Sequence, residues 1–268
     1  MAGTHNRDLP AGLAITSEGL RFGFRANESD LLPKFASIFV PGSIPTNFAN
    51  LDFIYSLGAE PRQQSYSACL GSRVLVKHAS LKAALDSIES DLHHTIAKHS
   101  HKHLFLHAGV IGWRDRAVLF PGRTCAGKST LIGALIRAGA VYFSDEFARI
   151  DACGLVHPFL RPLSFRTPQG KSRLHPEQEK LKIASGPCPI GAIIATRYIA
   201  DGVWRPARLS PGQAALELLS STVAVRLDPA KAMRHVGKLA CSAYAVHSPR
   251  GEAEATVPLL LETLDGCL

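Results

Sequence analysis

The sequence predicts an α/β fold preceded by a small β-rich N-terminal domain. From residue 103 to the end, strand-like and helix-like segments alternate, which is typical of an α/β domain with a central sheet. Residues 13–77 carry short apolar runs broken by Gly, Pro, Asn and Ser, which indicate short strands and turns. The 268 residues, 46% of them apolar, are enough for two modest domains.

The predicted N-terminal domain covers residues 1–79. Its strands are expected in "GLAITSEGLRFGF", "ASIFVPG" and "SRVLVKH". Residues 80–99 predict a helix, and we expect the segment 80–102 to bridge the two domains. Apolar residues three or four apart place one face of this helix against a core: Leu81, Leu85, Ile88, Leu92 and Ile96.

The second domain, 103–268, opens with two predicted strands, "HLFLHAGVIGW" and "RAVLFPG", joined by a turn at residues 113–115. "GKSTLIGALIRAGA" predicts a helix with Leu131, Ile132, Leu135 and Ile136 on one side and a stop at Gly139. "VYFSDEFARID" predicts the next strand. The later expected elements are a strand at 190–199, a helix entered at Ser210-Pro211, a helix at 228–240, a strand at 242–247 and a helix at 253–265.

Charge and composition limit the classes of ligand and the cellular location that we expect for this protein. The net charge of +8 and the pI of about 9.3 favour an acidic partner such as a nucleotide, a nucleic acid or an acidic peptide. No RNA-binding or zinc-finger signature accompanies the charge, so nucleic acid is not the expected ligand. No apolar run reaches the ~18 residues of a membrane span, and the N-terminus has no signal-peptide pattern, so we expect a cytoplasmic protein without a membrane partner. The six cysteines form no C-x-x-C pair and are expected to be free thiols.

The stretch "GRTCAGKST" satisfies the phosphate-loop pattern G-x-x-x-x-G-K-[ST] between a predicted strand and a predicted helix. Glycines let backbone N–H groups turn toward phosphate oxygens, and the helix directs its positive end to the same place. Lys128 is expected to reach the β and γ phosphates, and Ser129 to bind Mg²⁺. The predicted contacts to ATP are Gly122, Arg123, Thr124, Cys125, Ala126, Gly127, Lys128, Ser129 and Thr130.

Cys125 has two readings. A thiol near a helix N-terminus can be reactive, in which case its modification would block nucleotide binding. Alternatively, a small side chain simply fits at this position of the loop.

Asp145 and Glu146 follow the next predicted strand, where a phosphate-loop protein keeps its acidic magnesium ligand. One acid could hold Mg²⁺ and the other could accept a proton from an attacking hydroxyl. Neighbours in a strand point to opposite faces, so the two acids can serve one site only at a strand end or kink.

Two familiar classes are excluded by counting. All four asparagines precede the loop: Asn6, Asn27, Asn47 and Asn50. A guanine-reading Asn-Lys-x-Asp element after the loop is therefore impossible, and the H-R-D-x-x-x-x-N element of protein kinases is also missing.

"LHAGVIGWRDRAVLFPGRTCAGKSTLIGALIRAGAVYFSDEFARID" resembles the catalytic core of HPr serine kinase/phosphorylase and, more closely, the HPr kinase-related proteins of lasso-peptide-type clusters. The resemblance covers roughly residues 103–151 and implies a fold related to the nucleotide-binding core of phosphoenolpyruvate carboxykinase. It also implies ATP- and Mg²⁺-dependent phosphorylation of a serine hydroxyl. By this resemblance Asp145 is the base, Glu146 is the second acid and His107 lies near the reacting phosphate.

The sequence departs from that family at three points. Cys125 stands where the family loop usually has Gly, and Glu146 stands where the family has Asp. The acidic-Arg-Gly signature of the true kinase/phosphorylases is not recognisable, so nothing here supports a phosphorylase reaction or HPr as the substrate.

"FLRPLSFRTPQGKSRLHP" predicts a Pro-rich loop after the acidic pair, with Arg161, Arg166, Lys171 and Arg173. These cations could neutralise a transferring phosphate, with Arg166 as the best candidate, or they could form an ordinary basic surface. Seven histidines lie between residues 78 and 107, and their spacing fits a solvated helix end better than a metal site.

Three functions remain open from the sequence. The first is a serine kinase acting on a peptide or protein, the second is a kinase of a small molecule such as free serine or a sugar, and the third is a nucleotide-binding regulatory module without transfer. A homo-oligomer is also open.

Overall fold

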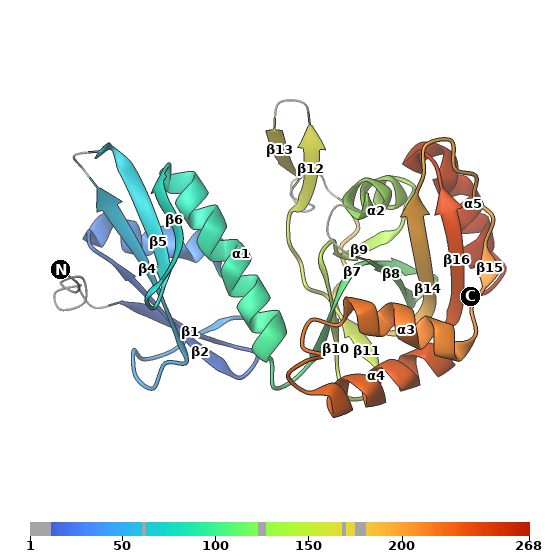
Figure 1. Cartoon of the computed structure of the whole chain (residues 1–268), viewed down its shortest axis with the longest axis horizontal. Coiled ribbons are helices and arrows are strands. Elements are labelled where there is room, and N and C mark those ends of the chain that lie inside the picture. Colours follow the sequence, from blue (N-terminus) through green and yellow to red (C-terminus); the bar gives the residue numbers. More distant parts are fainter. Residues whose placement is uncertain (1–11, 61–62, 123–126, 168–169, 175–180) are drawn as a thin grey trace. The chain divides into compact units, whose positions relative to one another are not determined.

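The computed structural model describes residues 12–60, 63–122, 127–167, 170–174 and 181–268. It has a mixed α/β fold that divides into two compact units, 1–102 and 103–268 (Figure 1). In the described part of the chain, no helix is long and apolar enough to cross a membrane.

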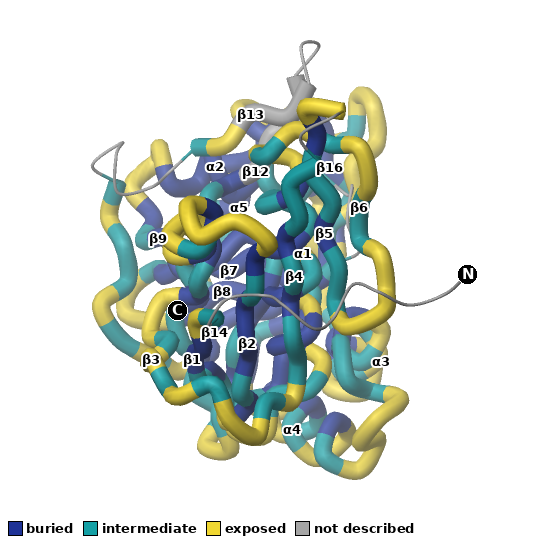
Figure 2. Tube along the Cα trace, turned by 90° about the vertical axis from the view of Figure 1, so that its left-hand side faces the viewer, coloured by how far each residue is buried: buried dark blue, intermediate teal, exposed yellow. Residues whose placement is uncertain are grey.

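The first unit is built on a six-stranded sheet with the order β3-β1-β2-β4-β5-β6. β2 and β4 are parallel, and the other neighbours are antiparallel. Most of β2 is buried and forms part of its core, to which β4 adds Tyr55 and Leu57 (Figure 2). The strands are β1 (Leu13–Ser17), β2 (Leu20–Ala26), β3 (Ile44–Pro45), β4 (Phe53–Glu60), β5 (Ser65–Leu70) and β6 (Arg73–Ala79).

The strand expected in "ASIFVPG" is wrong. The 3₁₀ helix η1 (Ser29–Ile38) covers its first part, and the rest is an extended connection and a turn. Leu31, Phe35 and Ile38 are buried, and their spacing of four and three residues puts one helical face on the core. The strand prediction used only the short apolar run and missed this longer period.

The helix predicted at 80–99 is confirmed as α1 (Leu81–His99), with the Ser80 hydroxyl accepting a hydrogen bond from the Ala83 N–H at 3.2 Å. Ile88, Leu92 and Ile96 are fully buried, and α1 packs on β5 and β6. The segment expected to bridge the domains therefore groups with the first unit.

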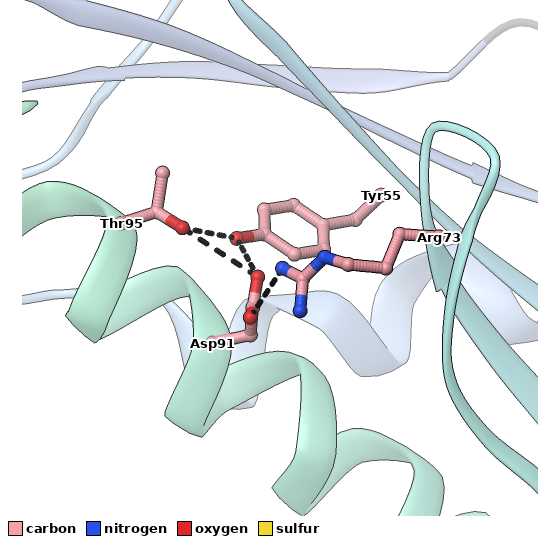
Figure 3. Close-up of polar contacts among 4 residues, drawn as sticks. All are labelled: Tyr55, Arg73, Asp91 and Thr95. Atoms are coloured by element: carbon pink, nitrogen blue, oxygen red, sulfur yellow. Dashed lines mark hydrogen bonds and ion pairs between the residues drawn. The ribbon is translucent and has the colours of Figure 1, made fainter.

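A polar cluster also ties α1 to the sheet (Figure 3). The Tyr55 hydroxyl donates to Asp91 at 2.9 Å and lies 3.3 Å from the Thr95 hydroxyl, and Arg73 pairs with Asp91 at 2.6 Å. Burial raises the pKa of Tyr55 well above its ordinary value, which keeps the phenol protonated as a donor.

The second unit is built on an eight-stranded sheet with the path β11-β10-β7-β8-β14-β16-β15, and β9 pairs with β7. β14 runs parallel to both β8 and β16. The strands are β7 (Leu104–Trp113), β8 (Arg116–Pro121), β9 (Val141–Ser144), β10 (Phe147–Ile150), β11 (Leu155–His157), β14 (Cys188–Tyr198), β15 (Ala207–Arg208) and β16 (Tyr244–Arg250).

Four helices pack on two apolar cores of this unit. α2 (Lys128–Arg137) and α5 (Ala253–Asp265) share one core with Val118 and Phe120 of β8. α3 (Pro211–Ser221) and α4 (Pro229–Ser242) share the other with Leu119. Because neighbouring strand residues point to opposite faces, the helices cover both faces of the sheet.

Most elements predicted for this unit are confirmed. The turn after Trp113 has positive φ at Arg114 (45°) and Asp115 (59°), which suits a tight hairpin. All four apolar residues predicted for the buried side of α2 are buried, and Gly139 follows the helix with φ 104°. The helix entered at Ser210 begins with a capping box.

Two predictions for this unit are corrected. "VYFSDEFARID" is not one strand but two, β9 and β10, separated by Asp145 and Glu146. The stretch expected to be a Pro-rich loop contains the hairpin of β12 (Leu163–Thr167) and β13 (Gly170–Leu174). Leu163 is fully buried in the core that contains α2, which anchors the start of this hairpin.

Candidate functional site

The strand β7 joins the two sequence segments that were predicted to form the site. The His107 carbonyl accepts a hydrogen bond from the Gly122 N–H at 3.2 Å, at the start of the phosphate loop. One residue further, the Ala108 N–H donates to the Glu146 carbonyl at 3.1 Å. Backbone contacts from one strand therefore place Gly122, the first residue of the loop, beside the acidic pair.

The C-terminal end of the loop has the left-handed backbone conformation that a glycine at this position predicts. Gly127 caps α2 in the left-handed region, at φ 72°. Lys128 reaches back across the loop, and its Nζ donates to the Gly122 carbonyl at 2.7 Å. Thr130 is exposed in the first turn of α2. The remaining predicted contacts, Arg123–Ala126 with Cys125 among them, lie outside the described residues.

Ser129 and Asp145 are in direct contact although they are 16 residues apart in sequence. The Ser129 hydroxyl donates to Asp145 Oδ2 at 2.8 Å. Asp145 is only 8% exposed, so this carboxylate is held at the start of α2 rather than in bulk solvent. Of the three residues predicted to hold a metal ion, Ser129, Asp145 and Glu146, the structure thus brings the first two into direct contact.

Glu146 points to a different partner. Its carboxylate forms an ion pair with the guanidinium of Arg161, which is only 12% exposed while Glu146 is 42% exposed. The Tyr142 hydroxyl donates to the Arg161 carbonyl at 2.6 Å, and burial raises the pKa of this tyrosine so that it stays a donor. The two acids lie at the break between β9 and β10, as a shared site requires, but their side chains contact different residues.

His107 and Arg166 are placed less directly at the site. The His107 ring packs on Phe147 with centroids 4.9 Å apart, and the His107 carbonyl accepts the hydrogen bond from the Gly122 N–H. Arg166 lies on β12 opposite Lys171, and its side chain is outside the described residues. Arg161, named with Arg166 as a basic residue of this stretch, contacts the acidic pair through its ion pair with Glu146.

Sequence reasoning missed Arg250, at the end of β16. Its side chain is 2% exposed, and Nη2 donates to the Gly127 carbonyl at 2.8 Å while Nη1 donates to the Gly251 carbonyl at 3.1 Å. A Cβ added to Gly127 would lie 2.6 Å from Nη2. The positive φ of Gly127 favours glycine, and a side chain there would also displace the end of Arg250. The sequence carried no specific signal for this role, because only the parallel pairing of β16 with β14, and of β14 with β8, brings Arg250 to the loop.

Within the described residues, no three His, Cys, Asp or Glu side chains come together as a metal site.

The second unit also has a cavity that is separate from the candidate site. This cavity of about 750 Å³ lies at the opposite ends of β7 and β8, beside the turn after Trp113, and none of the described site residues lines it.

Comparisons with known proteins leave the family open. No protein-family model matches the chain, and no curated protein matches it. Among solved structures, the HPr(Ser) kinase/phosphatase from Coxiella burnetii is similar at 17% identity, over 60% of this chain and 88% of that chain, with a TM-score of 0.36. A likeness at this level does not show family membership, so a functional proposal has to stand on the residues of the site.

Proposed function

We propose that the chain is an ATP-dependent kinase that transfers the γ-phosphate to a serine hydroxyl of a peptide or protein. The observation that carries the proposal is the contact of Ser129 with Asp145 at 2.8 Å. In phosphate-loop proteins, the serine after the lysine and an acid from a neighbouring strand together hold the magnesium ion of the nucleotide.

The described residues fit both ATP and Mg²⁺. A hydroxyl and a carboxylate oxygen are the hard ligands that Mg²⁺ prefers, and the ion usually takes its other ligands from phosphates and water. The N-terminus of α2 and the Lys128 ammonium supply positive charge for phosphates. The left-handed Gly127 provides the close backbone approach that a phosphate cradle needs.

Each residue has a specific role in the proposed transfer. Lys128 stabilises charge that develops on the transferring group, and the α2 N-terminus orients the phosphates. Ser129 and Asp145 would hold Mg²⁺, which neutralises phosphate charge when bound. A carboxylate of the acidic pair takes the proton from the acceptor hydroxyl. The resemblance assigns this base to Asp145, while the contact with Ser129 supports the metal role that Asp145 was also given.

The test is transfer from γ-labelled ATP to candidate serine peptides. Wild type should label peptide serine, and both Lys128→Ala and Asp145→Asn should abolish the label. Label on a metabolite would instead indicate a small-molecule kinase. Label found only as free phosphate, or none at all, would contradict the proposal and favour a regulatory module.

The same assay separates the two acids when Mg²⁺ is titrated. A variant that has lost a metal ligand should recover part of its activity at high Mg²⁺, whereas one that has lost the base should stay inactive at any Mg²⁺ concentration although ATP binds. Asp145→Asn and Glu146→Gln are nearly isosteric, which makes them a matched pair. Lys182→Ala, next to the separate cavity, is a control that should leave transfer intact.

A further inference from the structure

The ends of β14 and β16 carry an aromatic surface next to the phosphate loop. Both strands run parallel to β8, so their C-terminal ends lie at the same edge of the sheet as the loop (Figure 1). In open α/β sheets, ligands bind at this edge. Tyr198 is the last residue of β14, and it pairs with Arg250, the last residue of β16.

Tyr198 is close to the loop and partly open to solvent. A Cβ added to Gly127 would lie 4.0 Å from the Tyr198 Cβ, and Tyr198 is 44% exposed. The next two large apolar residues along this connection, Ile199 at 46% and Val203 at 55%, are also exposed. We call Tyr198, Ile199 and Val203 the Tyr198 surface.

Two contacts hold the Tyr198 side chain, and a third holds the backbone of the next residue. The Arg250 guanidinium lies over the Tyr198 ring, 5.5 Å from the ring centroid. The Tyr198 hydroxyl donates to Glu252 Oε1 at 2.7 Å. The Ile199 N–H donates to the Arg250 carbonyl at 2.9 Å, which ties the connection after β14 to β16. Since Arg250 also binds the Gly127 carbonyl, one side chain sets the position of both the ring and the loop.

We propose that the Tyr198 surface is the binding site for the nucleotide base. This inference rests on the proposed function, because phosphates held at Gly127–Ser129 put the rest of the nucleotide within reach of an aromatic ring at the same edge. The aromatic face stacks on the flat base, and the exposed Ile199 and Val203 cover its apolar edges. Stacking accepts any base, so the surface gives affinity for nucleotides over bare phosphates.

The test compares two ligands, ATP·Mg²⁺ and tripolyphosphate·Mg²⁺, by calorimetry on the full chain. Tyr198→Ala should weaken ATP binding about tenfold or more, the range of base–aromatic stacking. Its affinity for tripolyphosphate should stay unchanged, since that ligand has no base. Tyr198→Phe keeps the ring and should bind ATP like wild type. Leu259→Ala is the matched control, because Leu259 is also 44% exposed and lies in the same unit.

A second measurement does not depend on comparing affinities. A triphosphate carrying the fluorescent base 2-aminopurine should be quenched on binding to wild type and to Tyr198→Phe, and should stay bright on Tyr198→Ala. Equal ATP affinity and equal quenching in wild type and Tyr198→Ala would overturn the base site while leaving the proposed function intact. Wild type that binds neither ligand would overturn the proposed function, and this inference with it.

Discussion

Arg250 places a buried guanidinium against the backbone of the phosphate loop, and its replacement should affect every ligand of that loop. Arg250→Lys keeps the charge but cannot bind the Gly127 and Gly251 carbonyls with one planar fork. We expect a loss of about 1–3 kcal/mol in the free energy of unfolding, measured with urea. Binding of tripolyphosphate should weaken because the loop loses its support, and binding of ATP should weaken at least as much, because Arg250 also lies over the Tyr198 ring.

This pattern differs from that of Tyr198→Ala, which should affect only the ligand with a base. The control is Arg197→Lys. Arg197 directly precedes Tyr198 on β14 and is exposed. If Arg250→Lys weakened ATP alone, Arg250 would be contacting the base or ribose, and its assignment as a support of the loop would be wrong.

Cys188, at the start of β14, should be an unreactive thiol. Burial raises its pKa to about 11, with the nearby Asp115 carboxylate adding to the shift. An unfolded cysteine has a pKa of ~8.5, so between these values the folded state retains a proton that the unfolded state has lost. The contribution of this thiol to stability is therefore fully present below pH ~8.5 and is lost as the pH rises toward its folded pKa.

The measurement is iodoacetamide labelling at pH 8.5, followed by peptide mass spectrometry. The exposed Cys153 and Cys241 should be labelled well before Cys188. Replacing Cys188 with Ala should also make stability fall less steeply above pH 8.5. Labelling of all three thiols at one rate would show that Cys188 is as accessible as a surface residue.

At the scale of elements, Gly109 allows α2 to pack closely on β7. A Cβ at this position would lie 2.8 Å from Ile132 Cγ1 and 2.9 Å from Cδ1. Gly109→Ala should thus overpack the contact and cost about 1–3 kcal/mol in unfolding free energy. Because α2 begins at the phosphate loop, the displaced helix should also bind ATP more weakly.

A double-mutant cycle tests this explanation. Ile132→Ala alone should cost about 2–5 kcal/mol through the cavity it leaves. In that background, Gly109→Ala has room for its methyl group and should cost little or add stability, so the coupling between the two changes should be favourable. Simple additivity would mean that Gly109 is needed for a reason other than the space taken by Ile132.

The elements found from the sequence are those whose local pattern and tertiary environment agree. α2 was predicted because its apolar period, the loop before it and Gly139 all indicate the same helix. The stretch 141–151 was misread because a continuous apolar-to-acidic run contains no signal for a break. The break at Asp145–Glu146 is set by pairing, since β9 and β10 both bind β7 but at different positions.

The residues of the candidate site also differ in whether a local sequence pattern could predict them. The contact of Ser129 with Asp145 could be expected from a motif, because both residue types stand at fixed places around a phosphate loop. Arg250 and Tyr198 could not be expected in this way. They lie far along the chain, and only the parallel pairing of β14 with β8 and β16 brings them to the loop. Nothing in their local sequence distinguishes them from ordinary residues at strand ends.

At the scale of the whole molecule, each unit has its own apolar core. Phe24 is fully buried in the first unit, and Leu119 is fully buried in the second. Units with separate cores can unfold in separate steps, so we expect urea to give two transitions. Phe24→Ala should lower the free energy of unfolding of one transition, and Leu119→Ala that of the other, each by about 2–5 kcal/mol.

ATP·Mg²⁺ then identifies which transition belongs to the second unit. Every described residue of the proposed site, from His107 to Arg250, lies within 103–268. A ligand that binds only the folded state stabilises it by about 2.7 kcal/mol at a concentration of 100 times Kd. The nucleotide should raise the urea midpoint of the transition that Leu119→Ala weakens. It should leave unchanged the midpoint of the transition that Phe24→Ala weakens. Lys128→Ala should abolish the shift without merging the transitions. If ATP raised both transitions equally, or if both core variants moved a single transition, the two units would be unfolding as one, and the nucleotide would be coupled to the whole chain rather than to 103–268.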